Sequence, residues 1–218
     1  MNYNAGLVME RISQFASYAS GTLIRPGKTF ERLLADSFHL FYGSIAVLFV
    51  GTLYTIATVV GYLNGFGACT PPWLPLGAKE YYYYMTFFTI PAFWLTTLVF
   101  AAVVQFFSTF FHGKGNFEEC VAVAGFSLQI TMIPLMLIPE MIYFVFSIHN
   151  PMPTLELCGT LGLGLTADWI RLLLAVLWQL AVTMIGLKKV QQLSWGKTLA
   201  IGSIGFAAYE LVFWTYIR

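Results

Sequence analysis

The chain is 218 residues long, 58% hydrophobic and only 10% charged. Ordinary soluble chains carry about 25% charged residues, so a chain of this composition cannot hide its apolar surface in a single soluble core. It belongs in a membrane. Its formal net charge of +1 offers no clustered excess of Lys and Arg for phosphates, which excludes nucleic acid as a partner.

The first 37 residues are predicted to form an amphipathic segment on the membrane surface. Within residues 7–23 apolar side chains recur at spacings of three and four, which is typical of a helix with one apolar face. Pro26 interrupts this pattern, and a short second helix carrying Phe30 follows it. The alternative is a pair of ordinary helices packed on their own domain. The first strongly apolar run begins only near Phe38, which argues against a cleavable signal peptide.

Five later stretches are long and apolar enough to cross a bilayer, because about 20 helical residues span a hydrocarbon layer of about 30 Å. Loops rich in Pro and Gly, or short polar turns, separate them. The predicted spans are residues 38–63, 82–111, 120–148, 169–187 and 198–217. The sequence therefore predicts an all-α polytopic membrane protein. Residues 38–218 form a five-helix transmembrane domain, and residues 1–37 form N-terminal amphipathic interfacial helices.

The positions of Lys and Arg predict how the chain is oriented, because these residues accumulate in cytoplasmic loops. With a cytoplasmic N-terminus, eight of the 11 Lys and Arg residues fall on the cytoplasmic side and three outside. An odd number of crossings then places the C-terminus outside. We therefore expect a multi-pass protein with a cytoplasmic N-terminus and an external C-terminus.

Two carboxylates lie inside predicted spans, where an acidic group costs about 3 kcal/mol on insertion scales. Glu140 and Glu210 each lie about eight residues before the outer end of a helix, or roughly 12 Å deep. Arg171 enters from the same side and can reach a similar depth through its long side chain. We predict a cluster of these three residues, with Asp168 near its rim. It is either a structural lock between helices or a proton or cation pathway.

Three glutamines, Gln105, Gln129 and Gln179, fall on three different predicted spans. Each can form hydrogen bonds between helices, for about 0.6 kcal/mol on average. Packing between helices is the simpler interpretation, and a polar conduit lined by all three is the alternative.

Cys69 and Cys158 both fall in predicted external loops, where an oxidising exterior would allow a disulfide between them. The remaining cysteine, Cys120, lies at the cytoplasmic start of the third span. The three histidines are scattered over three boundaries and both sides of the membrane, so we expect no metal site and no cofactor.

Several short features occur in a recognisable order along the chain. They are Pro26 and Phe30 before the first span, Gly113, Gly115 and Phe117 at the start of the third, Gly125 inside it and Pro134 soon after. In this order they resemble the Yip1-domain family over nearly the whole chain. The resemblance implies an integral membrane protein.

Eukaryotic members of that family are proteins of the early secretory pathway that engage small GTPases, typically through longer cytosolic N-terminal regions. This chain has fewer than 40 residues before its first span and no acidic extension. It therefore resembles the compact prokaryotic branch. We expect the protein in a bacterial or archaeal cell membrane rather than in a eukaryotic endomembrane. The GTPase binding of the eukaryotic members is not expected for this chain.

No nucleophile motif and no phosphate-binding loop stand out in the sequence. We expect a membrane-organising, trafficking-related or adaptor protein without catalytic activity. Its partners would be membrane lipids and a protein at the cytoplasmic face, contacted through residues 1–37 and the turn at Lys114, and small-residue faces could support a homodimer. The alternative is a small transporter or channel that uses Glu140 and Glu210. A water-accessible cavity that reaches those carboxylates would favour transport.

Overall fold

The computed structural model describes residues 5–65, 77, 80–142 and 164–216, which form helices and turns with no strand among them. Two N-terminal helices precede a helical bundle. Five helices are long and apolar enough to cross a membrane. The predicted all-α fold with five crossings is confirmed. The helices are α1 (Ala5–Ile24), α2 (Pro26–Leu34), α3 (His39–Leu63), α4 (Tyr81–Phe110), α5 (Phe117–Ala124), η1 (Gly125–Ile130), η2 (Ile133–Leu137), α8 (Gly164–Gln191) and α9 (Trp195–Tyr216).

The third span combines α5, η1 and η2 and continues as far as Ile142 in the described part of the chain. It is the most buried of the five spans and packs against α3, α4 and α8. Its first turn is fixed by a capping box. The Asn116 side chain accepts a hydrogen bond from the Glu119 backbone N–H at 2.8 Å, and the Glu119 carboxylate accepts one from the Asn116 N–H at 3.0 Å. This arrangement satisfies two N–H groups that a helix start leaves free.

The span begins at Phe117, three residues earlier than predicted, because the capping box places the first turn there. The fourth helix also differs from the prediction, since it continues past Leu187 to Gln191. Lys188 and Lys189 stand in its last turn, where cations interact favourably with the carbonyl end of a helix. Lysine side chains can extend along apolar surface until their charged ends reach water. The two lysines therefore did not prevent the helix from continuing to Gln191.

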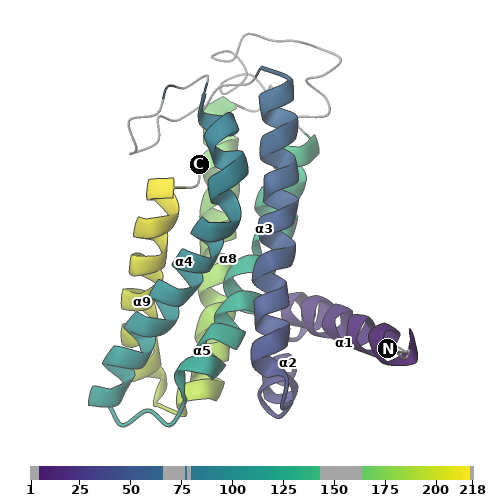
Figure 1. The fold of residues 1–218 in the computed structure, drawn as a ribbon. Coiled ribbons are helices and arrows are strands. Elements are labelled where there is room, and N and C mark those ends of the chain that lie inside the picture. The colour runs from purple at the N-terminus through teal and green to yellow at the C-terminus, as the bar shows by residue number, and fades with distance from the viewer. Residues whose placement is uncertain (1–4, 66–76, 78–79, 143–163, 217–218) are drawn as a thin grey trace.

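Figure 1 shows α3, α4, α8 and α9 running lengthwise through the bundle, with α1 extending sideways from beside α3 and α2 at the lower end of the bundle. The turn between α4 and α5 and the turn between α8 and α9 lie at this same end. We use the term basal end for this end of the bundle, which comprises α1, α2, the two turns at residues 112–116 and 192–194, and the ends of the helices that adjoin them. The segments predicted to face the cytoplasm thus lie together.

Glycines allow the spans to approach closely. A Cβ built on Gly186 of α8 would lie 2.4 Å from Val123 Cγ1 and 3.2 Å from the Phe30 ring. The first contact is shorter than real Cβ atoms make and the second is tight, so the missing Cβ of Gly186 lets α8 approach α5 and α2 this closely. Small residues serve this purpose in membranes, where close packing replaces the hydrophobic effect.

Candidate functional site

Helix α1 lies against the bundle well inside the span region. The ring of Phe15 stands 5.8 Å from the rings of Phe49 and Phe126. Phe49 is about ten residues into α3, or roughly 15 Å along its axis, and Phe126 lies at a similar distance into the third span. Helix α3 is longer than the hydrocarbon layer is thick by only a few ångströms at each end. A residue roughly 15 Å from its start is therefore at the depth of the apolar layer, and Phe15 packs at that level.

One side of α1 is held to the bundle by a polar contact. Asp36, in the linker after α2, accepts hydrogen bonds from Gln14 Nε2 at 2.6 Å and from the Tyr18 hydroxyl at 3.0 Å. Tyr18 is only 2% exposed and packs edge-on against Tyr42 of α3. Burial raises the pKa of Tyr18, because an ionised phenolate would lose its hydration there, and the nearby Asp36 carboxylate adds to this effect.

The rest of α1 is divided into an apolar side and a polar side. Ile12 is exposed and lies about 60° around the helix from Phe15, so the apolar side continues from the deep contact. Val8 is also exposed, about 20° from Phe15, and the exposed Met9 lies about 120° from Phe15, at the border with the polar side. Ser13 lies about 160° from Phe15, on the polar side. Helix α1 therefore has one side that packs on the bundle, one exposed apolar side and one exposed polar side.

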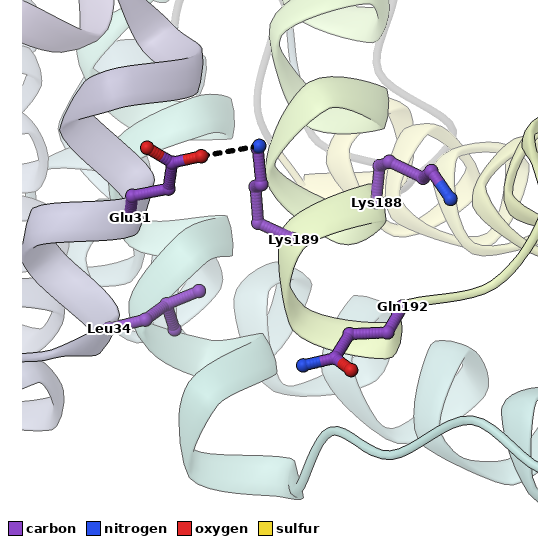
Figure 2. A pocket seen from close by; sticks show the side chains of 5 residues that line it. All are labelled: Glu31, Leu34, Lys188, Lys189 and Gln192. Carbon is purple, nitrogen blue, oxygen red and sulfur yellow. Dashed lines mark hydrogen bonds and ion pairs between the residues drawn. The ribbon is translucent and has the colours of Figure 1, made fainter.

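Helix α2 is fixed beneath the bundle by its apolar side chains and by an ion pair. Phe30 and Leu33 are fully buried. Lys189 Nζ of α8 lies 2.5 Å from the Glu31 carboxylate, whose pKa is lowered because it accepts this hydrogen bond beside a positive charge. Between α2 and the end of α8 lies a pocket of about 460 Å³, shown in Figure 2. It is lined by Glu31, Leu34, Lys188, Lys189 and Gln192.

The turn at residues 112–116 packs tightly on the end of α8. The Lys114 backbone N–H donates to the Gln191 carbonyl at 3.1 Å, while the Lys114 side chain is exposed. A Cβ built on Gly115 would lie 2.2 Å from Val190 Cγ1, so only glycine fits this contact. His112, the first residue of this turn, has φ of 58°, a left-handed conformation that non-glycine residues seldom adopt.

Gln105 forms a small buried polar group with Cys120 and Gln191 at the basal end. Gln191 Nε2 lies 3.5 Å from Gln105 Oε1 and 3.2 Å from Cys120 Sγ. Gln191 Oε1 is buried and has no hydrogen-bond partner within the described residues. Gln191 was not among the predicted site residues, because the fourth span was expected to end at Leu187.

The other two predicted glutamines make separate contacts deeper in the bundle. Gln129 Nε2 donates to Thr97 Oγ1 of α4 at 3.0 Å. Gln179 Nε2 donates to the Leu128 carbonyl at 2.6 Å and lies 3.3 Å from the Tyr209 hydroxyl. Each glutamine therefore connects neighbouring helices.

The π-helical segments of the third span supply carbonyl acceptors to α8. Arg171 Nη1 donates to the Leu135 carbonyl in η2 at 2.8 Å, as Gln179 donates to Leu128 in η1. A π turn widens the backbone ladder, and such turns often occur at functional positions. Arg171 also interacts electrostatically with Glu140. The structure thus brings two of the predicted cluster residues together.

Glu210 is placed differently. Its carboxylate accepts a hydrogen bond from Trp214 Nε1, one turn later on α9, at 2.7 Å. Within the described part of the chain it forms no ion pair with Arg171, so the expected group of three is not assembled. The Asp168 side chain, Cys69 and Cys158 lie outside the described residues.

The residues that carried the family resemblance shape the basal end and the third span. Pro26 opens α2, Phe30 is buried beneath α8, and Gly113 and Gly115 fit the turn onto α8. Phe117 begins α5 with an exposed ring, Gly125 begins η1, and Pro134 stands in the first turn of η2. Most of these positions therefore have a packing or backbone role in the structure.

The five apolar helices and their basal helices define a polytopic α-helical membrane protein. The family model of the Yip1 domain matches residues 20–217, nearly the whole chain. The chain belongs to the Yip1 family. Neither the comparison with curated proteins nor the comparison with solved structures gave a match.

Proposed function

We propose that this protein is a non-catalytic membrane-organising protein that inserts α1 into the cytoplasmic leaflet beside its bundle. The observation that carries the proposal is the division of α1 into three faces. Phe15 packs at the depth of Phe49, Ile12 continues the apolar side, and Ser13 lies on the polar side. An amphipathic helix in this position displaces lipid in one leaflet only.

The attachment of α1 supports this function, because a wedge acts on a membrane only if it is held in place. Asp36 bonds two side chains of α1, and the Arg11 guanidinium stands 3.7 Å from the centroid of the Phe38 ring. These contacts tie α1 to the start of α3. Bending of the leaflet would thus be coupled to the whole bundle.

The basal end faces the cytoplasm in this proposal, of a bacterial or archaeal cell. Eight of the 11 Lys and Arg residues of the chain lie on or beside this end, and the positive-inside rule associates such an excess with the cytoplasmic side. They are Arg11, Arg25, Lys28, Arg32, Lys114, Lys188, Lys189 and Lys197. The exposed Lys114 turn and α2 would offer a protein partner a surface there.

Ion transport is less well supported by these contacts. Gln129, Gln179 and Arg171 each donate to groups of the protein itself. The pocket of Figure 2 lies at the basal end, and its lining includes neither Glu140 nor Glu210. These interactions favour a structural role for the polar residues of the bundle.

The test is the shape of vesicles that contain the full chain at increasing protein density. We expect the wild-type protein to convert large vesicles into narrower or tubular ones in electron micrographs. Ile12→Asp places a charge on the lipid side of α1 and should abolish the effect. Ser13→Asp adds the same charge on the polar side and is the matched control. Wild-type vesicles that keep their diameter at every density would refute the proposal.

A further inference from the structure

The pocket between α2 and α8 has the chemistry of an anion site. Two lysines and one glutamine supply donors, and Leu34 supplies an apolar wall. Lys189 and Glu31 are joined across the pocket in Figure 2. Lysine is a common ligand of phosphate groups, to which it binds as a mobile point charge.

The ion pair in this pocket is exposed, so another anion can replace Glu31 as the partner of Lys189. The side chains of Lys189 and Glu31 are 38% and 57% exposed. Exposed pairs of this kind contribute little to stability, because water and salt compete with them. Lys28 also acts electrostatically on Glu31, so the basic groups near the pocket outnumber its single carboxylate. A stronger anion could therefore take the place of Glu31.

Helix-end lysines also offset the negative end of a helix dipole. Lys188 in addition donates to the Leu193 carbonyl, in the turn that follows α8. That role explains why lysines stand in the last turn of α8, but it does not require a pocket. Gln192 lines the same pocket with φ of 53°, in a left-handed conformation that non-glycine residues seldom adopt. The chain thus turns sharply beside the cavity.

In the proposed orientation the pocket also lies at the level of lipid headgroups, because it stands where a membrane-spanning helix ends. It is formed by the final residues of a membrane-spanning helix and by a helix beside α1. Anionic lipids attract basic residues at this level on the cytoplasmic leaflet. We propose that the pocket binds the phosphate of an anionic lipid headgroup, with Lys189 as its main ligand and Glu31 as the group it displaces. This goes beyond the proposed function, because headgroup binding needs no effect of α1 on membrane shape.

The test is binding of defined lipids to the full chain in neutral detergent, measured by native mass spectrometry. Phosphatidylglycerol should bind more tightly than zwitterionic phosphatidylcholine. Lys189→Gln should weaken phosphatidylglycerol binding by roughly tenfold, since one charge-assisted contact is lost. Glu31→Gln removes the competing carboxylate and should strengthen it.

Lys197→Gln is the matched control, because Lys197 lies at the basal end near the Phe111 ring and does not line the pocket. Equal weakening by Lys197→Gln and Lys189→Gln would overturn the proposal, as would Glu31→Gln binding less lipid than wild type.

A second experiment uses inorganic phosphate as a competitor of the lipid. If phosphate alone competes as well as the lipid, the site takes the free anion and the lipid assignment is wrong. If Lys189→Gln does not fold, Glu31→Gln still decides the outcome.

Discussion

Gly43 and Gly125 bring the backbones of α3 and the third span into direct contact. A Cβ built on Gly125 would lie 2.3 Å from the Gly43 carbonyl oxygen, and one built on Gly43 would lie 2.5 Å from Ala122 Cα. Real side chains do not approach backbone atoms so closely. The central span therefore reaches α3 only because both residues lack a side chain.

Gly125→Ala should destabilise the bundle by about 1–3 kcal/mol, because the added methyl must push two backbones apart. Thermal unfolding in detergent measures the change. Gly196→Ala is the matched control, since nothing lies within 4 Å of its built Cβ and alanine favours the helix. Equal melting temperatures for Gly125→Ala and wild type would show that this crossing is not tight.

Asp36→Ala should release α1 without unfolding the bundle, because the carboxylate holds Gln14 and Tyr18 in place. Hydrogen exchange should accelerate across Ala5–Ile24 while the exchange of α3 stays slow. Glu10→Ala alters an exposed residue of the same helix and should leave exchange unchanged. If α1 stays protected after Asp36→Ala, apolar packing alone holds it.

Arg171→Met should destabilise the fold by about 1–3 kcal/mol, because the Leu135 carbonyl loses its charged donor and Glu140 loses a positive neighbour. Glu140→Gln should cost less, since the amide remains polar without a charge. Neither change should alter ion flux into proteoliposomes. A well-folded Glu140→Gln protein with altered flux would instead favour the transport alternative.

The ion pair of Glu31 predicts a pH effect with a definite sign. The pKa of Glu31 is lowered by Lys189, so the pair's contribution to stability is complete above the ordinary carboxylate pKa. It is lost as the pH falls through the lowered value. A ¹³C NMR titration of the Glu31 carboxyl should show a midpoint that Lys189→Gln moves upward. No movement would mean that Lys189 does not hold this carboxylate in solution.

Much of this architecture follows from hydropathy, because a membrane span must be both long and apolar. The rotation of each helix does not follow from it. Glu140 and Glu210 were predicted at similar depth, yet Glu210 is bonded to Trp214 on its own helix and only Glu140 interacts with Arg171. An aromatic N–H donor four residues after Glu210 was a signal that the sequence did contain.

The π-helical carbonyls were not predictable, because composition does not show where a backbone ladder widens. Pro134 is the only local hint, since it lacks an N–H and disturbs the ladder near η2. Capping was easier to foresee. Two acidic residues, Glu118 and Glu119, stand in the first turn of the third span, and Glu119 completes the capping box there.

The position of α1 is the central claim, and site-directed spin labelling tests it most directly. A label at position 12 and a label at position 13 are placed on the full chain in vesicles, and their collisions with oxygen and with a water-soluble nickel complex are compared. We predict that the label at Ile12 collides mainly with oxygen, which concentrates in hydrocarbon, and that the label at Ser13 collides mainly with nickel. Two labels with the same dominant partner would contradict the account.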